Sequence, residues 1–448
     1  MTFTDTKLTE GSIAKKLLAF SVPMIFGNLL QQVYNLVDTM ICGRFIGADA
    51  LAAVGSVYTL MTFLTSIIIG LCMGSGAFFS VDYGANKIDA LCEDIKLSFV
   101  FIGVVSLFLG VIVYPLTDPI LAILQTPSEI VDFTKEYIRI IFAGIIFTFL
   151  YNFFAYLLRA IGNSVIPLIF LGISAVLNIG LDLWFVVGLK QGVAGAALAT
   201  VISQAVAGLG LTFYVIRKFP YLLKNIKNFR INTIRLKEII INDVSTGIQQ
   251  SVMNFGILMI QGLVNSFGTT IMAAFTAAVK IDTIAYMPAQ EFGNAYSLFV
   301  SQNFGAKKYD RIKKGMKISF ILSIVFCQII SLLIFISANN LMGIFVDSSE
   351  TDIILQGAKY LSIEGAFYAG IGILFLWYGY FRGVNKPQIS LILTVISLGT
   401  RVLLSYVFAP NTALGVVAIW LSIPIGWILA DIFGVIFYKN ISNRISSL

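Results

Sequence analysis

The sequence predicts an all-α integral membrane protein with twelve transmembrane helices in two six-helix bundles that repeat in parallel. The first supporting observation is composition: 58% of the 448 residues are hydrophobic, 12% are charged, and the mean hydropathy is +0.90. A soluble domain carries about 25% charged residues. The second observation is an internal repeat, and the third is the uneven distribution of Lys and Arg between the loops.

Twelve apolar segments are long enough to cross a bilayer as a helix, which takes about 20 residues. Apolar and polar residues do not alternate along them, so membrane β-strands, which need only about 10 alternating residues, are excluded. In chain order, we expect spans at residues 14–40, 51–79, 95–116, 135–159, 165–188, 193–217, 238–266, 270–302, 316–337, 354–381, 387–409 and 414–438.

An internal repeat explains why these spans fall into two sets of six. Residues 47–104 read again at 268–325, displaced by 221 positions without a gap, and further along the displacement becomes 223. Identical pairs include Gly47/Gly268, Ser80/Ser301, Gly84/Gly305, Lys87/Lys308 and Arg159/Arg382. Nearly the whole chain is therefore one bundle of spans used twice, an architecture typical of secondary transporters.

The Lys and Arg residues set the orientation, because basic loops stay in the cytoplasm. Of the 30 Lys and Arg residues, 23 lie in the two termini and in the loops on the same side as the termini, whereas Arg44 and Lys190 lie on the other side. Both termini are therefore expected in the cytoplasm. We expect an N-terminal lobe at 1–217, a basic cytoplasmic linker at 218–237 and a C-terminal lobe at 238–448.

Composition also narrows the class of function. The net charge of +7 follows from the basic loops, which suit anionic lipid, so we expect contact with the lipid bilayer and none with nucleic acid. The chain has no histidine, which excludes His-based catalysis, metal sites and proton relays. The four cysteines show no paired spacing and are interpreted as apolar fillers. No phosphate-binding loop is present, and we expect neither an enzyme nor a resident cofactor.

Ionisable side chains inside spans are costly and mark function by default. Asp182 and Asn178 lie about 9 and 15 Å from the outer end of their span, on one helix face. Thr200 lies about 12 Å below the outer start of the next span, and Asp38 is near the outer end of the first. These four residues supply hard oxygen ligands, which suit a small cation, and two close carboxyl groups could also carry a proton.

The alternative is a hydrogen-bonded network that locks these spans together. The repeat argues against it for the two acids, since Asp38 aligns with Met259 and Asp182 with Ser405. The shared fold therefore does not need either carboxyl group, and a packing network could use neutral groups at a lower desolvation cost.

A second polar set lies in the C-terminal lobe and could line a substrate cavity. Its charged members could instead neutralise one another, for example Glu364 with Arg401. Aromatic and methionine side chains could complete such a cavity by stacking on flat or cationic molecules and by adapting their shape. The residues assigned to the cavity are Tyr34, Asn35, Gln249, Met253, Lys280, Asp282, Met287, Glu364 and Arg401.

Three sets of residues resemble the multidrug and toxic compound extrusion (MATE) family over essentially the full length. They are the segment YNLVD at 34–38, the paired elements SVDYGANKIDA at 80–90 and SQNFGAKKYDR at 301–311, and LNIGLDLWF at 177–185. The resemblance implies antiport, in which a cation enters while a substrate leaves. In the prokaryotic branch with a cation site in the amino-terminal lobe, the ligand positions match Asp38, Asn178, Asp182 and Thr200.

The branch with acidic ligands in spans 7 and 10 fits less well, because we expect glutamines such as Gln249 but no acid in the interior of span 7, and Glu364 in span 10 is only a partial match. We expect a monomeric antiporter in the cell (inner) membrane that exports small organic, cationic compounds in exchange for Na⁺ or H⁺. The alternatives are a lipid-linked oligosaccharide flippase, a membrane-embedded transferase and a sensory receptor that does not transport. A flippase would need a more cationic cavity, and the transferase lacks catalytic residues.

Overall fold

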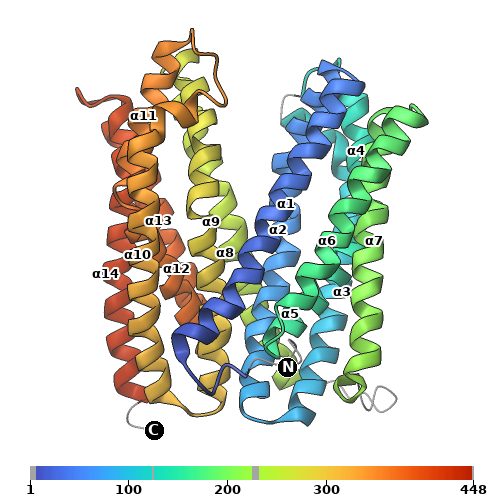
Figure 1. Ribbon diagram of the computed structural model, residues 1–448, viewed down its shortest axis with the longest axis vertical. Coiled ribbons are helices and arrows are strands. Elements are labelled where there is room, and N and C mark those ends of the chain that lie inside the picture. Colours follow the sequence, from blue (N-terminus) through green and yellow to red (C-terminus); the bar gives the residue numbers. More distant parts are fainter. Residues whose placement is uncertain (1–6, 124–125, 224–231, 446–448) are drawn as a thin grey trace. The chain divides into compact units, whose positions relative to one another are not determined.

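The computed structural model describes residues 7–123, 126–223 and 232–445, and every regular element within these ranges is a helix. The prediction of an all-α protein is therefore confirmed. The first repeat contains α1 (Ile13–Phe45), α2 (Ala48–Gly84), α3 (Ile88–Ile123), α4 (Val131–Ala143), α5 (Ile145–Ala160), α6 (Val165–Asp182), the π-helical turn η1 (Leu183–Gly188), α7 (Gly192–Lys218) and the short 3₁₀ turn η2 (Pro220–Leu223). The second contains α8 (Thr233–Asn265), α9 (Thr269–Gly305), α10 (Tyr309–Met342), α11 (Thr351–Gly365), α12 (Tyr368–Gly383), α13 (Pro387–Phe408) and α14 (Val416–Ile445) (Figure 1).

The helices match the expected spans in order. Among the described residues, nine helices are long and apolar enough to cross a membrane, and up to eleven if each of two bent pairs is one span. The remaining expected segment, 238–266, corresponds to α8, which has 33 residues but carries the amides Gln249, Gln250 and Gln261 within its apolar part. Length and hydropathy alone therefore recover every helix of both repeats except the most polar one.

The fourth span of each repeat is bent, a feature that the apolar pattern does not reveal. Helices α4 and α5 meet at 48°, and α11 and α12 meet at 53°. Gly144 separates α4 from α5, and a side chain there would place its Cβ 2.5 Å from Val201 on α7. The first bend therefore lies where α7 packs too closely for any other residue.

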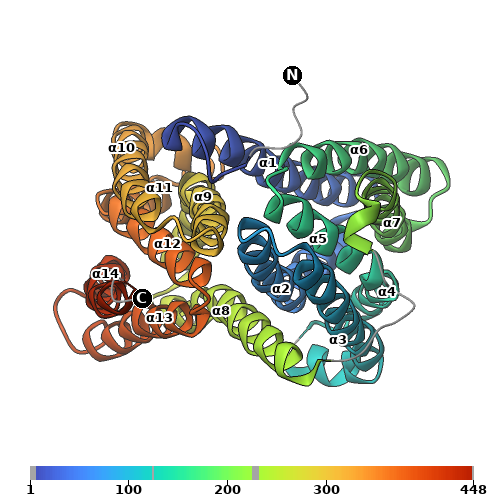
Figure 2. The same ribbon diagram turned by 90° about the horizontal axis from the view of Figure 1, so that it is seen from below.

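The chain divides into two compact units, and two helices belong to both. The first unit contains residues 22–251 and the second contains 8–21 and 252–448. Helix α1 thus begins in the second unit and α8 begins in the first. In the first unit α2 packs on α3 and α5, and α7 packs on α5 and α6 (Figure 2). In the second, α9 packs on α10, α11 and α12, and α13 packs on α14. The predicted lobes, 1–217 and 238–448, follow the repeat and differ from these units at the starts of the two shared helices.

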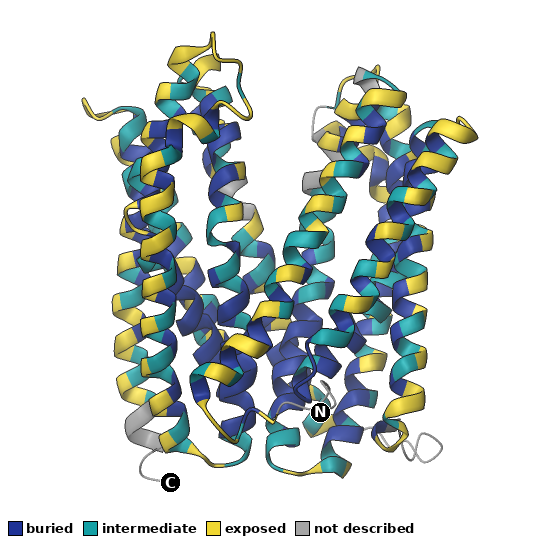
Figure 3. Cartoon of the chain, viewed as in Figure 1, coloured by how far each residue is buried: buried dark blue, intermediate teal, exposed yellow. Residues whose placement is uncertain are grey.

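Burial within each unit fits a protein that lies in lipid. Large apolar side chains cover the outward faces of the helices (Figure 3), for example Phe108 at 62% exposure, Val176 at 75% and Ile336 at 72%. Such faces are expected where hydrocarbon rather than water is the solvent. The interior of the first unit holds a cluster of phenylalanine rings, among them Phe79, Phe149 and Phe153, whose neighbouring centroids lie 5.6–5.9 Å apart.

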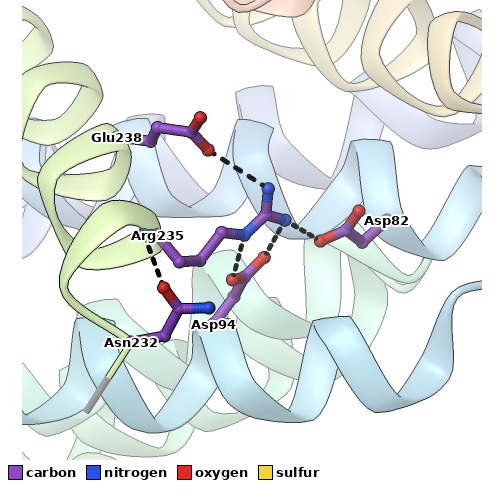
Figure 4. A network of polar contacts seen from close by, with 5 residues as sticks. All are labelled: Asp82, Asp94, Asn232, Arg235 and Glu238. Carbon is purple, nitrogen blue, oxygen red and sulfur yellow. Dashed lines mark hydrogen bonds and ion pairs between the residues drawn. The ribbon is translucent and has the colours of Figure 1, made fainter.

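A charged cluster fixes the start of α8 to the first unit (Figure 4). We call it the Arg235 cluster and define it as Asp82, Asp94, Arg235 and Glu238. The Nε and Nη2 atoms of Arg235 donate to the two carboxylate oxygens of Asp94, each at 2.8 Å, and Nη2 also donates to Asp82. The guanidinium lies 4.3 Å from the centre of the Phe78 ring. Asp94 is fully buried, so Arg235 is the counter-ion of a carboxylate without access to water.

The segment before α1 is held in the second unit by hydrogen bonds rather than by ion pairs. The Leu8 N–H donates to Gln302 Oε1 at 3.0 Å, and the guanidinium of Arg311 donates to the carbonyl oxygens of Leu8, Glu10 and Gly11. Arg311 lies over the ring of Phe299, the repeat counterpart of Phe78. In each repeat, an arginine that lies over the equivalent phenylalanine ring fixes a nearby segment, but the two arginines have different hydrogen-bond partners.

We expect Arg235→Gln to lower the free energy of unfolding by roughly 3–5 kcal/mol, because it leaves the buried Asp94 carboxylate without a counter-ion. Thermal unfolding of the purified protein in detergent measures the effect. Arg235→Gln combined with Asp94→Asn should recover much of the loss. Arg217→Gln, a change at an exposed arginine, is the matched control. Fully additive losses in the double variant would contradict the ion pair.

Candidate cation site and substrate-cavity residues

Four residues predicted as cation ligands belong to the first unit. Asp38 lies on α1, Asn178 and Asp182 lie on α6, and all three are buried, whereas Thr200 on α7 is half-buried. Asn178 Nδ2 donates to Thr200 Oγ1 at 3.4 Å, and the Thr200 hydroxyl donates to the carbonyl of Ala196 one turn earlier. The amide and the hydroxyl are thereby fixed relative to each other.

The two carboxyl groups of the set are direct neighbours. The Asp38 carboxyl interacts with the carboxyl of Asp182 and with the hydroxyl of Tyr137 on α4. Among the described residues, Asp38 Oδ1, Asn178 Oδ1 and both oxygens of Asp182 receive no hydrogen bond. Buried oxygens of this kind are rarely left without a partner. Four acceptor oxygens, three of them on acids, are therefore available to one positively charged species.

The local backbone at Asp182 is also unusual. Helix α6 ends at this residue and continues as the π-helical turn η1. Turns of this type widen the helix by one residue and occur frequently at functional sites. The sequence analysis did not identify this turn, because the apolar residues around it suit either kind of helix.

Tyr137 is a member of the site that the sequence analysis missed. It is buried on α4, and its hydroxyl interacts with Asp38. One signal could have revealed it: Tyr137 lies near the outer end of its span, at the depth assigned to the two acids. With 18 Tyr and 37 Phe in the chain, however, a single tyrosine does not stand out.

The repeat provides an internal comparison for the acidic pair. Ser405 occupies the position that aligns with Asp182, and its buried hydroxyl lies 2.8 Å from the hydroxyl of Ser422. In the second unit, two neutral side chains thus satisfy each other at this place. Packing of the shared fold is achieved without a charge there, so the carboxyl of Asp182 needs a different explanation.

A buried acid in the second unit is held by tyrosines. Asp282 on α9 accepts hydrogen bonds from the hydroxyls of Tyr368 at 2.7 Å and Tyr360 at 3.5 Å. Glu364 is fully buried, and neither of its carboxyl oxygens has a hydrogen-bond partner in the described part of the chain. Arg401 is near enough to act electrostatically on both acids. No ion pair shorter than 4 Å joins Glu364 to Arg401 among the described residues, so direct pairing of these two charges is not what the structure shows.

The other predicted cavity residues differ in exposure. Gln249 and Met287 are buried, Tyr34, Asn35 and Met253 are half-buried, and Lys280 is exposed. Tyr34, Asn35 and Gln249 belong to the first unit and the remaining six residues to the second. Their assignment to a substrate cavity stays a prediction.

A duplicated bundle of apolar helices that buries acids within its spans is a secondary transporter. The family model described as MatE matches residues 23–184 and 246–407, one stretch in each repeat. The chain therefore belongs to the multidrug and toxic compound extrusion family of efflux transporters. In this family two six-helix repeats give twelve transmembrane helices, in agreement with the predicted architecture.

Individual relatives agree with this assignment. The chain is 29% identical to "Probable multidrug resistance protein YpnP" of Bacillus subtilis (strain 168), with 96% of both chains aligned. It is 24% identical to "Multidrug export protein MepA" of Staphylococcus haemolyticus (strain JCSC1435), over 98% of this chain and 96% of that protein. A solved outward-facing multidrug resistance MATE transporter has the same fold, with a TM-score of 0.92, 23% identity, and coverage of 99% of this chain and 98% of the other.

If the acceptor oxygens around Asp182 bind Na⁺, the ion should stabilise the folded protein. At a concentration about 100-fold above Kd, the gain is about 2.7 kcal/mol. We expect the melting temperature in detergent to rise when Na⁺ replaces K⁺, and we expect Asp182→Asn to abolish the rise. Asp282→Asn, a change at a buried acid of the other unit, should keep it. An unchanged wild-type melting temperature would show that the site does not bind Na⁺.

Proposed function

We propose that the protein is an antiporter that exports small organic, mainly cationic, compounds while a cation moves inward at Asp38, Asn178, Asp182 and Thr200. The observation that carries the proposal is the pair of neighbouring carboxyl groups, Asp38 and Asp182, with acceptor oxygens that receive no hydrogen bond from the described part of the chain. The names of the relatives, which describe multidrug resistance and export, support the substrate class. A lipid-linked oligosaccharide flippase is not favoured, because family and relatives point to drug efflux.

The coupling requires that the transporter bind the cation and the substrate alternately rather than together, although different residues bind each of them. Two close carboxylates repel each other, and a bound Na⁺ or a shared proton removes that repulsion. The charge at α1 and α6 then differs between the loaded and the empty state. A gradient of the cation can bias the conformational equilibrium only through such a difference in binding free energy. Tyr137 would hold the Asp38 carboxyl in place through this change.

Asp38→Asn tests the coupling, since asparagine keeps the size of the side chain and removes its charge. We expect the variant to insert and purify normally, while gradient-driven efflux of a fluorescent cation from sealed vesicles falls roughly tenfold or more. Sodium and pH gradients are imposed separately. Asp118→Asn is the control, because that carboxylate is exposed and pairs with Lys135 at 2.7 Å, a contact that contributes little. Wild-type rates for Asp38→Asn would leave Asp38 as a packing residue.

We also propose that the protein lies in the cell (inner) membrane as a monomer, with both termini in the cytoplasm. The excess of Lys and Arg in the terminal segments and in the loops on their side supports this orientation. All four native cysteines are buried, so single introduced cysteines report on the side of the membrane.

Lys237→Cys lies at the start of α8 and Ser349→Cys in the connection between α10 and α11, and both positions are exposed. In intact cells, an impermeant thiol reagent should label Ser349→Cys and leave Lys237→Cys unmodified. After the cells are opened, both variants should react. The reverse pattern in intact cells would overturn the proposed orientation.

A further inference from the structure

Helix α8 buries a further acid in the first unit, far from the proposed cation ligands in the sequence. Asp243 is fully buried, and its Oδ2 accepts a hydrogen bond of 2.6 Å from the hydroxyl of Ser75 on α2. Its Oδ1 has no hydrogen-bond partner, and no Lys or Arg lies within 4 Å of the carboxyl group, in the described part of the chain. A carboxyl group in a span with one hydrogen bond and no counter-ion is costly unless it has a function.

The packing of α2 against α8 is built around this carboxyl group. A Cβ atom on Gly74 would lie 2.8 Å from both the Cα and the Oδ1 of Asp243, so only glycine leaves room there. One turn earlier on α2, a Cβ atom on Gly70 would lie 2.6 Å from the Cα of Gly247 on α8. The two glycines therefore bring the backbones of α2 and α8 into direct contact beside the Asp243 carboxyl group. Because no cation lies beside this buried carboxyl among the described residues, a bound proton is the simplest way to neutralise it.

Polar groups continue from Asp243 in both directions along α8. Toward the start of the helix, the Arg235 cluster lies about 12 Å away along the axis, and it combines three carboxylates with one guanidinium. Beyond Asp243, Gln249 is buried with an unpartnered Oε1. The Ser66 and Ser251 hydroxyls lie 3.4 Å apart. The interface of α2 and α8 thus carries polar atoms from the helix start to its middle.

The carboxyl of Asp243 has a defined set of titratable and charged neighbours. Asn242, next to it on α8, is also buried, and neither polar atom of its amide has a partner among the described residues. The titratable or charged groups that face this region come from α2, α3 and α8: Cys72, Asp82, Asp94, Arg235 and Glu238. Acids outnumber the single cation, so the region favours the arrival of a proton.

We propose that Asp243 is a second proton-carrying residue, which receives the proton on Oδ1 and passes it through the Arg235 cluster to cytoplasmic water. A hydronium ion supplies the proton, so that an O–H bond forms at Oδ1 and a water molecule is left, while Ser75 continues to donate to Oδ2. When the O–H bond breaks, water carries the proton to Glu238, the exposed carboxylate of the Arg235 cluster, which releases it to cytoplasmic water, and the Asp243 carboxyl regains its charge. This inference rests on the proposed antiport function, with H⁺ as a transported cation.

Infrared difference spectroscopy of the purified transporter tests the proton directly and does not depend on transport. Between acidic and alkaline buffer, the wild type should lose a carbonyl band of a protonated carboxylic acid, and Asp243→Asn should lack that component. Ser75→Ala, which keeps the acid and removes its hydrogen bond, should shift the pH at which the component disappears. Asp431→Asn, a change at an acid within α14, is the control and should retain it. A wild-type band that Asp243→Asn leaves unchanged would overturn the proposal.

A transport assay is the second test of the proposal. Under an imposed pH gradient, Asp243→Asn should reduce the initial efflux rate at least tenfold while binding of the fluorescent cation persists. Wild-type rates for this variant, or a wild type that responds to Na⁺ gradients alone, would also overturn the proton-carrying role. Failure of the proposed coupling at Asp38 gives a different result from failure of the Asp243 proposal. In the first case Asp38→Asn transports at the wild-type rate, and in the second Asp243→Asn leaves the infrared band unchanged.

Discussion

A charge inside a lipid-embedded helix must be paired, hydrogen-bonded or neutralised by a bound ion, and the structure uses each solution at a different place. The Arg235 cluster pairs its charges directly. Asp282 is stabilised by two tyrosine hydroxyls. Asp38 and Asp182 are neighbours, and three of their four carboxyl oxygens receive no hydrogen bond from the described residues. The last arrangement is the least stable of the three without a bound cation, and that instability is what makes it suitable for coupling.

The two repeats show how one helical framework accommodates different chemistry. Positions that pack the framework stay alike, as with Phe78 and Phe299, each under an arginine. Positions that carry charge have diverged, so that Asp182 corresponds to the serine of a neutral hydroxyl pair. The close approach of α2 to α8 at Gly70 and Gly74 shows the same division, because the glycines set the packing and Asp243 adds a charge to it.

Much of the fold could be predicted from the sequence, because a bilayer restricts spanning segments to long apolar helices. The same reasoning located Asp38 and Asp182, since an acid within a span is rare enough to stand out. Tyr137 and the π-helical turn after Asp182 could not be predicted, because their residue types are common in spans and only tertiary contacts distinguish them. The bend at Gly144 was missed for a similar reason: it depends on Val201, which is distant in sequence.

The neutral amides of α8 also made its role difficult to predict from the sequence. Its apolar pattern is weakened by glutamines, yet the helix crosses from one compact unit to the other and carries both Arg235 and Asp243. Asp243 lies within the expected span 238–266, and the prediction that the interior of this span holds no acid was wrong, because Asp243 is fully buried. The exposed Lys280 shows the limit of this reasoning, because depth estimated along a helix does not reveal which face a side chain occupies.

The exchange of helix starts between the units has a consequence for biosynthesis. Residues 8–21 are synthesised long before their partners, including Gln302 and Arg311, which are separated from them by about 300 residues of chain. Such contacts of high sequence separation form late and slowly. Residues 8–21 must therefore remain without their final contacts until much of the second repeat has been synthesised. A chain released before Gln302 and Arg311 are made would lack the partners that hold this segment.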